Sequence, residues 1–357
     1  MSNSLHVLVV DDSAVVRQTI RALLGMHAGI HTSVAHDPLI AMEKMKQERP
    51  DVIILDLEMP RMDGLTFLRK IMDEDPLPVI VCSGHVGDAS ALAIRALEAG
   101  AVELLAKPKV GVQAFLEESA VLLADSVRAA ALCKPALRAR GRGNTRIDAP
   151  PARSPVTRGM TPAIIAMGAS TGGTEALREI LEALPVTMPP IAIVQHMPNP
   201  FTRSFAKRLN EVCAIEVKEA ESGDEMLAGR ALLAPGDKHL VVLQRAARFY
   251  VDVVDGPLVS RHRPSVDVLF RSVASAAGAS AAGVILTGMG ADGAAGLAEM
   301  CSAGAHTIAQ DEASCAVFGM PNEAIKRGGV REVLPLAAIA GALIGRCHPS
   351  CAHQNHR

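Results

Sequence analysis

The sequence contains very few aromatic residues, with seven Phe, one Tyr and no Trp in 357 residues. Most proteins that bind single-stranded nucleic acid stack the bases on aromatic side chains, so this scarcity argues against that class. A strong net charge is absent as well, because 36 Lys and Arg residues nearly balance 38 Asp and Glu residues. The overall charge therefore predicts no general electrostatic attraction to nucleic acid or to an anionic membrane.

Two further absences concern membranes and disulfides. No apolar run reaches the roughly 18 to 20 residues that a membrane-spanning helix needs. The first residues, MSNSLHVLVV, lack the basic region and the long apolar region of a signal peptide. Seven cysteines, an odd number spread along the chain, do not form the pattern of a disulfide framework. We therefore expect reduced thiols, a cytoplasmic location and no direct insertion into a membrane.

Two blocks of the chain alternate short apolar runs with amphipathic stretches. The first begins at HVLVV and ends with VQAFLEESAVLLADSV, and the second begins at AIIAM and includes neighbouring short strands that could pair as hairpins. Regular alternation of strand and helix is typical of α/β proteins with parallel sheets. We expect a doubly wound parallel-sheet domain over residues 1–125 and an α/β domain with a mostly parallel sheet over residues 161–347.

The segments outside these blocks are polar. The stretch KPALRARGRGNTRIDAPPARSPVTRGMTP is rich in basic residues, Gly and Pro and has few apolar side chains to bury. We interpret residues 126–160 as a flexible basic linker, with a solvated tether favoured over a docking segment. Residues 348–357 form a polar tail. At this chain end a frayed segment is favoured over a soft-metal site built from Cys347, His348, Cys351, His353 and His356.

Charged residues of the first block follow strands at the points where the strands end. Asp11 and Asp12 follow HVLVV, Asp56 follows DVIIL, and Lys107 follows AVELLA. In a doubly wound sheet these carboxyl ends bind ligands, and converging carboxylates suit a hard cation such as Mg²⁺. A carboxylate beside that ion can attack a phosphoryl donor, while Lys107 neutralises the charge and Ser83 hydrogen-bonds the phosphate. Capping of loops or helices explains each residue singly, but the full set poorly.

This set of residues resembles the receiver domain of two-component response regulators, over about residues 4–125. The resemblance implies that Asp11 and Asp12 help to bind Mg²⁺, with the backbone carbonyl of Glu58 as a further ligand. It also implies that Asp56 is the phosphoacceptor and lies at the metal.

The same resemblance makes Ser83 the switch hydroxyl and Lys107 the receiver lysine. One position departs from the family pattern, because Leu104 stands three residues before Lys107, where an aromatic residue is usual. Phosphorylation should still occur, but a switch based on an aromatic side chain is not assumed. A phosphorylated receiver acts by changing an interface.

In the second block, Ser170 lies in GASTG, which matches the G-x-S-x-G pattern of a nucleophile elbow. The required context is present, because AIIAM precedes it and an amphipathic helix pattern follows. With three fixed letters the pattern is weak, so a plain glycine-rich turn or a phosphate-binding turn stays open. A nucleophilic serine also needs a base and an acid that orients the base.

A histidine and an aspartate follow other strands of the second block. His196 closes IAIVQH, and Asp292 lies in TGMGADG directly after AAGVIL, at the sheet edge to which Ser170 belongs. A single histidine at a strand end is more often structural, but three compatible groups at one edge favour a Ser-His-Asp triad. Three other histidines are less well placed, at a strand start, in a polar loop and at the start of a run: His239, His262 and His306.

A competing interpretation comes from residues 288–293, GMGADG, a literal G-x-G-x-x-G between a strand and a helix. Asp311 follows at about the spacing of a ribose-binding acid, as in a dinucleotide site. Only about 60 residues follow the motif, and a dinucleotide site would leave Ser170 and His196 unexplained. The glycines also allow backbone N–H groups to approach an oxyanion.

Several stretches together resemble the catalytic domain of the CheB family, the chemotaxis protein-glutamate methylesterases: GASTGGTEAL, VQHMP, LAPGDKHL, RPSVDVLF, LTGMGADG and AQDEASCAVFGMP. The similarity covers about residues 161–347, and the receiver and linker ahead of it match the same domain order. It implies that Ser170 is the nucleophile, His196 the base and Asp292 the residue that orients His196. The backbone N–H of Met289 would contribute to the oxyanion hole.

The function implied by this resemblance is a phosphorylation-activated serine esterase in chemotaxis adaptation. It would demethylate glutamyl methyl esters on methyl-accepting chemoreceptors, release methanol and deamidate some receptor glutamines. A chemotaxis histidine kinase would be the phosphodonor, Mg²⁺ would serve the receiver, and the catalytic domain would need no cofactor. The alternative is a response regulator with a nucleotide-binding or DNA-binding output domain, although no helix-turn-helix or basic face supports a nucleic-acid partner.

Overall fold

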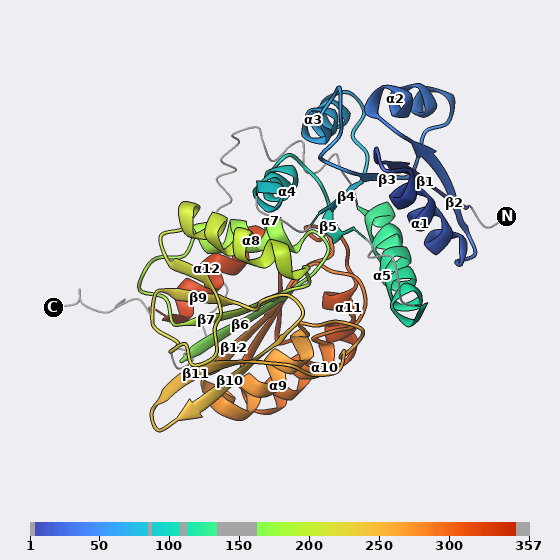
Figure 1. The fold of residues 1–357 in the computed structure, drawn as a ribbon. Helices are drawn as coiled ribbons and strands as arrows, with labels where there is room; N and C mark the ends of the chain where they lie inside the picture. The colour runs from blue at the N-terminus through green and yellow to red at the C-terminus, as the bar shows by residue number, and fades with distance from the viewer. Residues whose placement is uncertain (1–3, 85–87, 108–112, 134–162, 348–357) are drawn as a thin grey trace. The chain divides into compact units, whose positions relative to one another are not determined.

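The computed structural model describes residues 4–84, 88–107, 113–133 and 163–347, which form two compact units, each with its own sheet (Figure 1). Most of the expected linker and the whole of the expected tail, residues 348–357, lie outside the described residues. None of the described helices is long and apolar enough to cross a membrane.

The first unit contains a five-stranded parallel sheet with the strand order β2-β1-β3-β4-β5. Most residues of the central strands are buried and apolar, as expected for a parallel sheet that is covered on both faces. The strands are β1 (Leu5–Val10), β2 (Ile30–Ala35), β3 (Val52–Leu55), β4 (Val79–Ser83) and β5 (Glu103–Ala106).

Five helices cover this sheet, with α1 and α5 on one face and α2, α3 and α4 on the other (Figure 1). Ser13, Asp37 and Asp63 cap the first three helices, because each side chain accepts a hydrogen bond from a backbone N–H in the first turn. Helix α5 continues to Leu132, so the expected domain boundary at residue 125 falls inside it. The helices are α1 (Ala14–Gly25), α2 (Pro38–Gln47), α3 (Gly64–Glu74), α4 (Asp88–Glu98) and α5 (Gln113–Leu132).

The second unit contains a seven-stranded parallel sheet with the order β14-β13-β12-β6-β7-β9-β8. A separate antiparallel hairpin joins β10 (His239–Arg245) to β11 (Arg248–Val254). The strands of the large sheet are β6 (Ile164–Ala169), β7 (Ile191–Gln195), β8 (Glu216–Glu219), β9 (Arg230–Leu233), β12 (Ala281–Ile285), β13 (His306–Gln310) and β14 (Glu332–Leu334).

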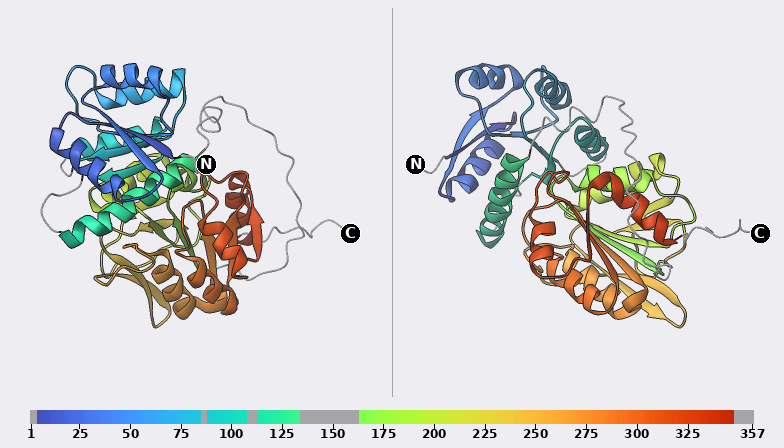
Figure 2. Two further views of the ribbon diagram at one scale, coloured as in Figure 1. Left: turned by 90° about the vertical axis from the view of Figure 1, so that its right-hand side faces the viewer. Right: turned by 180° about the vertical axis from the view of Figure 1, so that it is seen from behind.

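Helices lie on both faces of the large sheet, with α9, α10 and α11 on one side and α7, α8 and α12 on the other (Figure 2). Leu269 and Phe270 of α9 are fully buried in a core that also takes in residues of the hairpin. The elements are α7 (Gly173–Glu182), α8 (Asn199–Val212), α9 (Val266–Ala277), the short 3₁₀ helix η1 (Gly278–Ser280), α10 (Ala294–Ser302), α11 (Met320–Lys326) and α12 (Leu336–Cys347).

The register of the central strands determines which residues meet at the carboxyl edge of the large sheet. Ala169, the last residue of β6, pairs with Gln195, the last residue of β7, and Gly168 pairs with Ile285, the last residue of β12. Because neighbouring parallel strands lie about 4.8 Å apart, the loops that follow these three strands start side by side. Ser170 and His196 are the first residues of two of these loops.

Candidate functional site

Ser170 occupies a tight turn between β6 and α7. Its N–H donates to the carbonyl of Thr287 (3.0 Å), and its own carbonyl accepts from the N–H of Gly173 (2.7 Å). Gly172 has a φ of 76°, a left-handed conformation that favours glycine. At Gly173 a Cβ would lie 2.6 Å from the Cβ of Ala169 and would also strike the side chain of Gln195. Gly172 is therefore required by backbone geometry and Gly173 by close packing.

Gln195 joins the ends of β6 and β7. Its Nε2 donates to the carbonyl of Ser170 (2.9 Å) and to the carbonyl of His196 (3.2 Å). The N–H of His196 donates to the carbonyl of Ala169 (3.0 Å). Gln195 is buried and was not predicted to belong to the site, because only its position directly before His196 marks it in the sequence. These bonds hold the backbones of Ser170 and His196 together.

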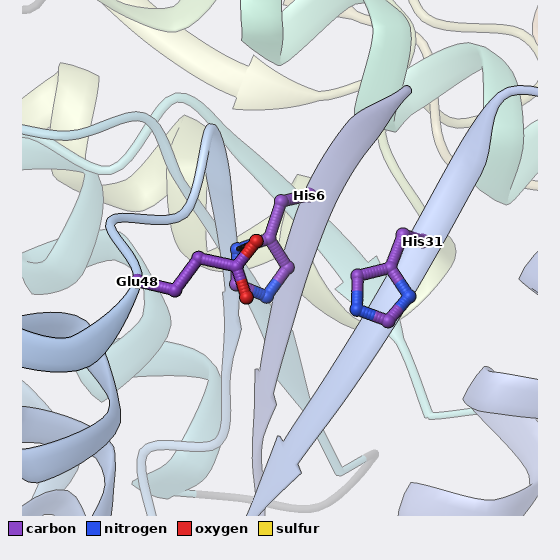
Figure 3. Close-up of side chains that lie close together, drawn as sticks. All are labelled: His6, His31 and Glu48. Carbon is purple, nitrogen blue, oxygen red and sulfur yellow. Dashed lines mark ion pairs between the residues drawn. The ribbon is translucent and has the colours of Figure 1, made fainter. Parts of the chain in front are cut away.

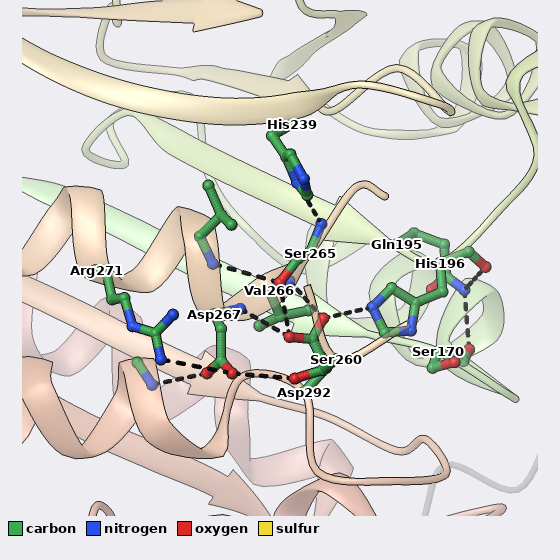
Figure 4. A network of polar contacts seen from close by, with 12 residues as sticks. Ser170, Gln195, His196, His239, Ser260, Ser265, Val266, Asp267, Arg271 and Asp292 are labelled. Carbon is green, nitrogen blue, oxygen red and sulfur yellow. Dashed lines mark hydrogen bonds and ion pairs between the residues drawn. The ribbon is translucent and has the colours of Figure 1, made fainter. Parts of the chain in front are cut away.

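The expected pairing of His196 with Asp292 is present. His196 Nε2 lies 2.8 Å from Asp292 Oδ2, and both side chains are buried. The carboxylate also sits at the amino-terminal end of α9, where Oδ2 accepts from the N–H of Val266 (2.7 Å). Oδ1 accepts from Ser265 Oγ (2.7 Å) and from the N–H of Asp267 (3.1 Å), as Figure 4 shows. The amino terminus of a helix favours a negative charge.

These hydrogen bonds determine the ionisation of Asp292. Burial works against the charged form, but the bonds from His196, Ser265 and the backbone of Val266 outweigh it and hold the pKa of Asp292 below its ordinary value. Asp292 is therefore a carboxylate at neutral pH and can only accept hydrogen bonds. It follows that His196 Nε2 carries the proton that points to Asp292.

The second ring nitrogen of His196 is the one available as a base. His196 Nδ1 is buried and has no hydrogen-bond partner among the described residues. In Figure 4 the imidazole is drawn between Asp292 and Ser170. Within the described residues no hydrogen bond joins Ser170 Oγ to His196, and catalytic contacts of this kind are often long before substrate binds.

His262 stacks on His196, with the ring centroids 3.7 Å apart and the planes 8° from parallel. Burial, and then the nearby His196, lower the pKa of His262 to about 3, so this imidazole is neutral at pH 7. Backbone hydrogen bonds with Val259 (2.9 and 3.1 Å) hold its loop. The sequence pattern ranked His262 behind His196 as a polar-loop residue, and no sequence signal revealed the stacking.

The two other histidines considered from the sequence have structural partners. His239 Nε2 lies 2.9 Å from the carbonyl of Pro257, and its Nδ1 accepts from the N–H of Ser265 (3.2 Å). His306 Nε2 lies 2.9 Å from a carboxylate oxygen of Glu332. Both ring nitrogens of His239 are therefore occupied, and His306 begins β13, at the end of the strand opposite to the edge where Ser170 lies.

The loop after β12 lies directly against Ser170. A Cβ on Gly288 would be 2.7 Å from the Cβ of Ser170, and the carbonyl of Gly288 accepts from the N–H groups of Gly319 (3.1 Å) and Met320 (2.8 Å). The N–H of Met289 donates no hydrogen bond to any of the described residues. Its place next to Gly288 is compatible with the oxyanion role expected from the sequence, which stays a prediction.

Each glycine of GMGADG is explained by packing or by its backbone: Gly288 and Gly293 pack closely against other residues, and Gly290 has a φ of 87°. Gly293 has a φ of 87°, and a Cβ there would strike the side chain of Val266. The carboxylate of Asp311, the expected ribose partner of the dinucleotide interpretation, instead accepts from the N–H (3.0 Å) and the hydroxyl (2.5 Å) of Ser314. These contacts explain the motif without a nucleotide.

The acidic residues of the first unit also come together. Asp11, Asp12 and Asp56 each offer a carboxylate oxygen, and these atoms lie within 4.8 Å of one another. Lys107 Nζ is 2.7 Å from Asp56 Oδ2 and 3.1 Å from Asp11 Oδ2. Burial, and to a smaller extent the neighbouring Asp11, raise the pKa of Asp56, although Lys107 opposes the shift. A cluster of oxygen ligands with excess negative charge suits a hard cation such as Mg²⁺.

The remaining receiver positions lie around this cluster. The N–H of Glu58 donates to Asp56 Oδ1 (3.2 Å), and the N–H of Lys107 donates to the carbonyl of Ser83 (3.1 Å). Ser83 Oγ is buried and has no partner among the described residues. Leu104 is buried in β5, so the position where an aromatic is usual belongs to the core here.

Two protein-family models match the chain. The CheB methylesterase model matches residues 165–343, and the response regulator receiver domain model matches residues 7–115. Protein-glutamate methylesterase/protein-glutamine glutaminase 3 of Geobacter metallireducens is 53% identical over 357 residues, which cover 96% of this chain and 99% of that protein. The chain belongs to the CheB methylesterase family.

Other CheB proteins agree with this assignment. Protein-glutamate methylesterase/protein-glutamine glutaminase 1 of Anaeromyxobacter dehalogenans is 54% identical over 346 residues, covering 95% of this chain and 98% of that protein. The crystal structure of the Thermotoga maritima CheB methylesterase catalytic domain is 38% identical, with a TM-score of 0.50, and covers 52% of this chain and 98% of that chain. The predicted fold, a receiver followed by a CheB catalytic domain, is confirmed. The alternative of a nucleotide-binding or DNA-binding output domain is wrong.

Proposed function

We propose that this CheB-family chain is a serine esterase that removes methyl groups from glutamyl methyl esters of chemoreceptors and deamidates receptor glutamines. The observation that carries the proposal is the hydrogen bond between His196 Nε2 and Asp292, at the sheet edge where Ser170 follows β6. The names of the relatives in Geobacter and Anaeromyxobacter supply the substrate class.

In the first half of the reaction, Ser170 Oγ attacks the side-chain carbonyl carbon of the methyl ester. His196 Nδ1 takes the hydroxyl proton, and the backbone N–H of Met289 donates to the developing oxyanion. When the tetrahedral intermediate collapses, the bond to the methoxy group breaks and His196 returns the proton, so that methanol leaves. A glutamyl ester of Ser170 remains.

In the second half, water attacks this ester and His196 Nδ1 takes a proton from the water. The bond to Ser170 Oγ breaks, the proton passes from His196 to Ser170, and the receptor leaves the site with a glutamate carboxylate on its side chain. With a glutamine substrate the same steps release ammonia in place of methanol. General-base catalysis contributes roughly 10² to 10⁴ in rate, and one oxyanion donor contributes about 10² to 10³.

The residues around His196 support the proposed mechanism in different ways. Asp292 is ionised and fixed by α9, so it can orient the imidazole and stabilise the imidazolium that forms when Ser170 loses its proton. Neutral His262 packs flat on the ring and brings no competing charge at pH 7. Gln195 keeps the backbone of Ser170 in place.

The receiver would control this activity through phosphorylation of Asp56 by a chemotaxis histidine kinase. Asp11, Asp12, Asp56 and the backbone carbonyl of Glu58 would hold Mg²⁺, which supplies positive charge to the phosphoryl oxygens. Lys107, now paired with Asp56, would contact the new phosphoryl group. The hydroxyl of Ser83 has no partner among the described residues, which supports its role as the switch that hydrogen-bonds a phosphoryl oxygen.

The order of the domains suggests how the receiver regulates the catalytic domain. The receiver, residues 1–125, would restrain the catalytic domain, residues 161–347, until phosphorylation weakens their contact, with residues 126–160 as the linker and 348–357 as a polar tail. The cytoplasmic location stays a prediction from the sequence.

Mass spectrometry of receptor peptides tests the proposed reactions. Methylated chemoreceptor membranes are incubated with the full-length protein and a small phosphodonor, with Ser170→Ala in parallel. We expect loss of methyl groups from glutamyl sites and conversion of some glutamines to glutamates, with neither change in the variant. Peptides that stay methylated in the presence of folded, phosphorylated protein would refute the methylesterase assignment.

A further inference from the structure

A second group of metal-binding side chains lies in the receiver unit, at the opposite edge of its sheet from Asp56. His6, His31 and Glu48 each offer one ligand atom, and these atoms lie within 4.8 Å of one another (Figure 3). His6 is the second residue of β1, whereas Asp11 directly follows the end of that strand. At roughly 3.3 Å per residue, the strand places the two groups roughly 16 Å apart.

The register of β1 and β2 brings the two histidines together. His6 pairs with His31 across the parallel strands, so both side chains project from the same face. Their rings stack with centroids 5.3 Å apart and an angle of 25° between the planes. Glu48 is the C-cap residue of α2, and its Oε1 lies 3.8 Å from His6 Nδ1. That separation is too long for a hydrogen bond.

The hydrogen bonds of His6 leave one ring nitrogen unused. His6 Nε2 lies 2.7 Å from Ser33 Oγ, a distance that fits an N–H donating to the hydroxyl. His6 Nδ1 is buried and has no hydrogen-bond partner among the described residues. A histidine that binds a metal characteristically donates its other ring N–H to a second group, which fixes the tautomer and the ring orientation. Ser33 is in the position to do this for His6.

We propose that His6 Nδ1, a ring nitrogen of His31 and the carboxylate of Glu48 bind a divalent transition-metal ion of the Zn²⁺ class. Two imidazoles and one carboxylate suit such an ion, whereas Mg²⁺ prefers oxygen ligands only. Three protein ligands leave a fourth tetrahedral position for water. The ligand type therefore separates this site from the acidic site at Asp56.

The geometry requires only small movements. Metal–nitrogen distances of about 2.0 to 2.1 Å place tetrahedral ligand atoms roughly 3.4 Å apart. The ligand atoms now lie within 4.8 Å of one another, so side chains must close by at most about 1.4 Å. His31 and Glu48 are exposed and have room to move, while buried His6 gives the site a fixed point. The bound ion would tie together β1, β2 and the end of α2.

A Zn²⁺ titration of the full-length protein against a chromophoric chelator tests the proposal. His31→Ala and Glu48→Gln remove one ligand each at exposed positions that leave the core intact. His36→Ala is the matched control, because this exposed receiver histidine pairs with Asp37 and lies outside the cluster. We expect the wild type and His36→Ala to bind one more tight ion than His31→Ala, with the affinity of Glu48→Gln reduced at least about tenfold. All other histidines and cysteines are common to the four proteins, and His36→Ala measures what a histidine outside the cluster contributes.

Ser33→Ala distinguishes a metal site from a simple pair of stacked histidine rings, because only a metal site predicts that this substitution weakens metal binding. Loss of a group that orients a metal-binding histidine typically weakens binding about 10- to 100-fold, so the same reduction is expected here. Co²⁺ in place of Zn²⁺ should give a difference absorption spectrum, wild type minus His31→Ala, typical of tetrahedral nitrogen and oxygen ligands without thiolate charge transfer. Equal stoichiometry and affinity in the wild type, His31→Ala and Glu48→Gln would overturn the proposal.

A measurement on the wild type alone guards against folding effects of the variants. Addition of one equivalent of Zn²⁺ should shift the ring ¹⁵N NMR resonances of His6 and His31, and at His6 the larger shift should be at Nδ1. If the added ion perturbs only other histidines, such as His196 or His262, the proposal is refuted. Ion binding that is confined to those residues would mean that His6, His31 and Glu48 do not form a metal site.

Discussion

Asp292→Asn is the most informative single substitution, because it keeps the shape of the side chain and removes its charge. The carboxylate of Asp292 accepts four hydrogen bonds, from His196 Nε2, Ser265 Oγ and the N–H groups of Val266 and Asp267. An amide can replace only one carboxylate oxygen as an acceptor, so at least one of the two backbone N–H groups or His196 must face an NH₂ group. The negative charge that stabilises the imidazolium is lost as well.

The size of the effect follows from the distance between the charges. With His196 Nε2 at 2.8 Å from Asp292 Oδ2, the charge centres lie near 4 Å, and at an effective dielectric constant near 20 the attraction is about 4 kcal/mol. We therefore expect kcat to fall by about 10³-fold, at 1.36 kcal/mol for each factor of ten. A buried donor left without an acceptor should also lower the free energy of unfolding by about 1 to 3 kcal/mol.

The assay compares methanol release by wild type, Asp292→Asn and a control, with urea unfolding of all three. Asp224→Asn is the matched control, because Asp224 also binds a backbone N–H and a charged partner, Lys218. It adjoins β8, which is separated from β6 by β7 and β9. The control should keep wild-type kcat. Activity of Asp292→Asn within a few-fold of wild type would refute the role assigned to the His196–Asp292 pair.

Acid should remove part of this stabilisation. Asp292 has a folded-state pKa below its ordinary value of 3.8, so the unfolded state binds more protons between the two values. Its contribution is complete above about pH 4 and is lost as the pH falls through the lower folded-state value. The difference in stability between wild type and Asp292→Asn should therefore narrow only below pH 4.

Three further predictions follow from the same structure. In the pH dependence of kcat between pH 5 and 8, His262→Gln should still show a single ionisation, since a pKa of about 3 keeps His262 neutral there. Because that pKa lies below the unfolded value, His262 makes the free energy of unfolding fall as the pH drops from about 6.5 towards 3. Urea unfolding should therefore show a shallower fall for the variant than for the wild type. Gly173→Ala, whose Cβ would strike Gln195 and Ala169, should lower the free energy of unfolding by about 1 to 3 kcal/mol and reduce kcat, and an unchanged unfolding midpoint would contradict the packing described here. Asp56→Asn should keep the basal rate of methanol release but show no stimulation by acetyl phosphate, and full stimulation would show that another group accepts the phosphoryl.

One physical reason allowed the sequence to predict the sheets and to assign the three residues of the proposed triad to one sheet edge. Buried parallel strands are continuous apolar runs, and the residues that follow them share one edge of the sheet. Ser170, His196 and Asp292 could therefore be assigned to one edge before any contact was known. The same reasoning predicted that the carboxylates of Asp11 and Asp56 lie close together at the carboxyl edge of the first sheet.

Features that depend on loop conformation could not be predicted. His262 reaches His196 through a turn in which Ser260 and Arg261 have positive φ values of 52° and 67°. Because neither residue is a glycine, the sequence contains no signal for this conformation. The choice of His196 Nδ1 as the base nitrogen depends on the ring orientation that Asp292 imposes. The tertiary contact of Gln195 with two carbonyls likewise has no local pattern.

Methanol release from methylated chemoreceptor membranes tests the central claim most directly. Wild type and Ser170→Ala are compared, each with and without acetyl phosphate, after both are shown to be folded. The account predicts release by wild type, faster release with acetyl phosphate, and none from Ser170→Ala under either condition. Release that persists in Ser170→Ala would contradict the assignment of Ser170 as the nucleophile, and no release from the phosphorylated wild type would contradict the proposed reaction.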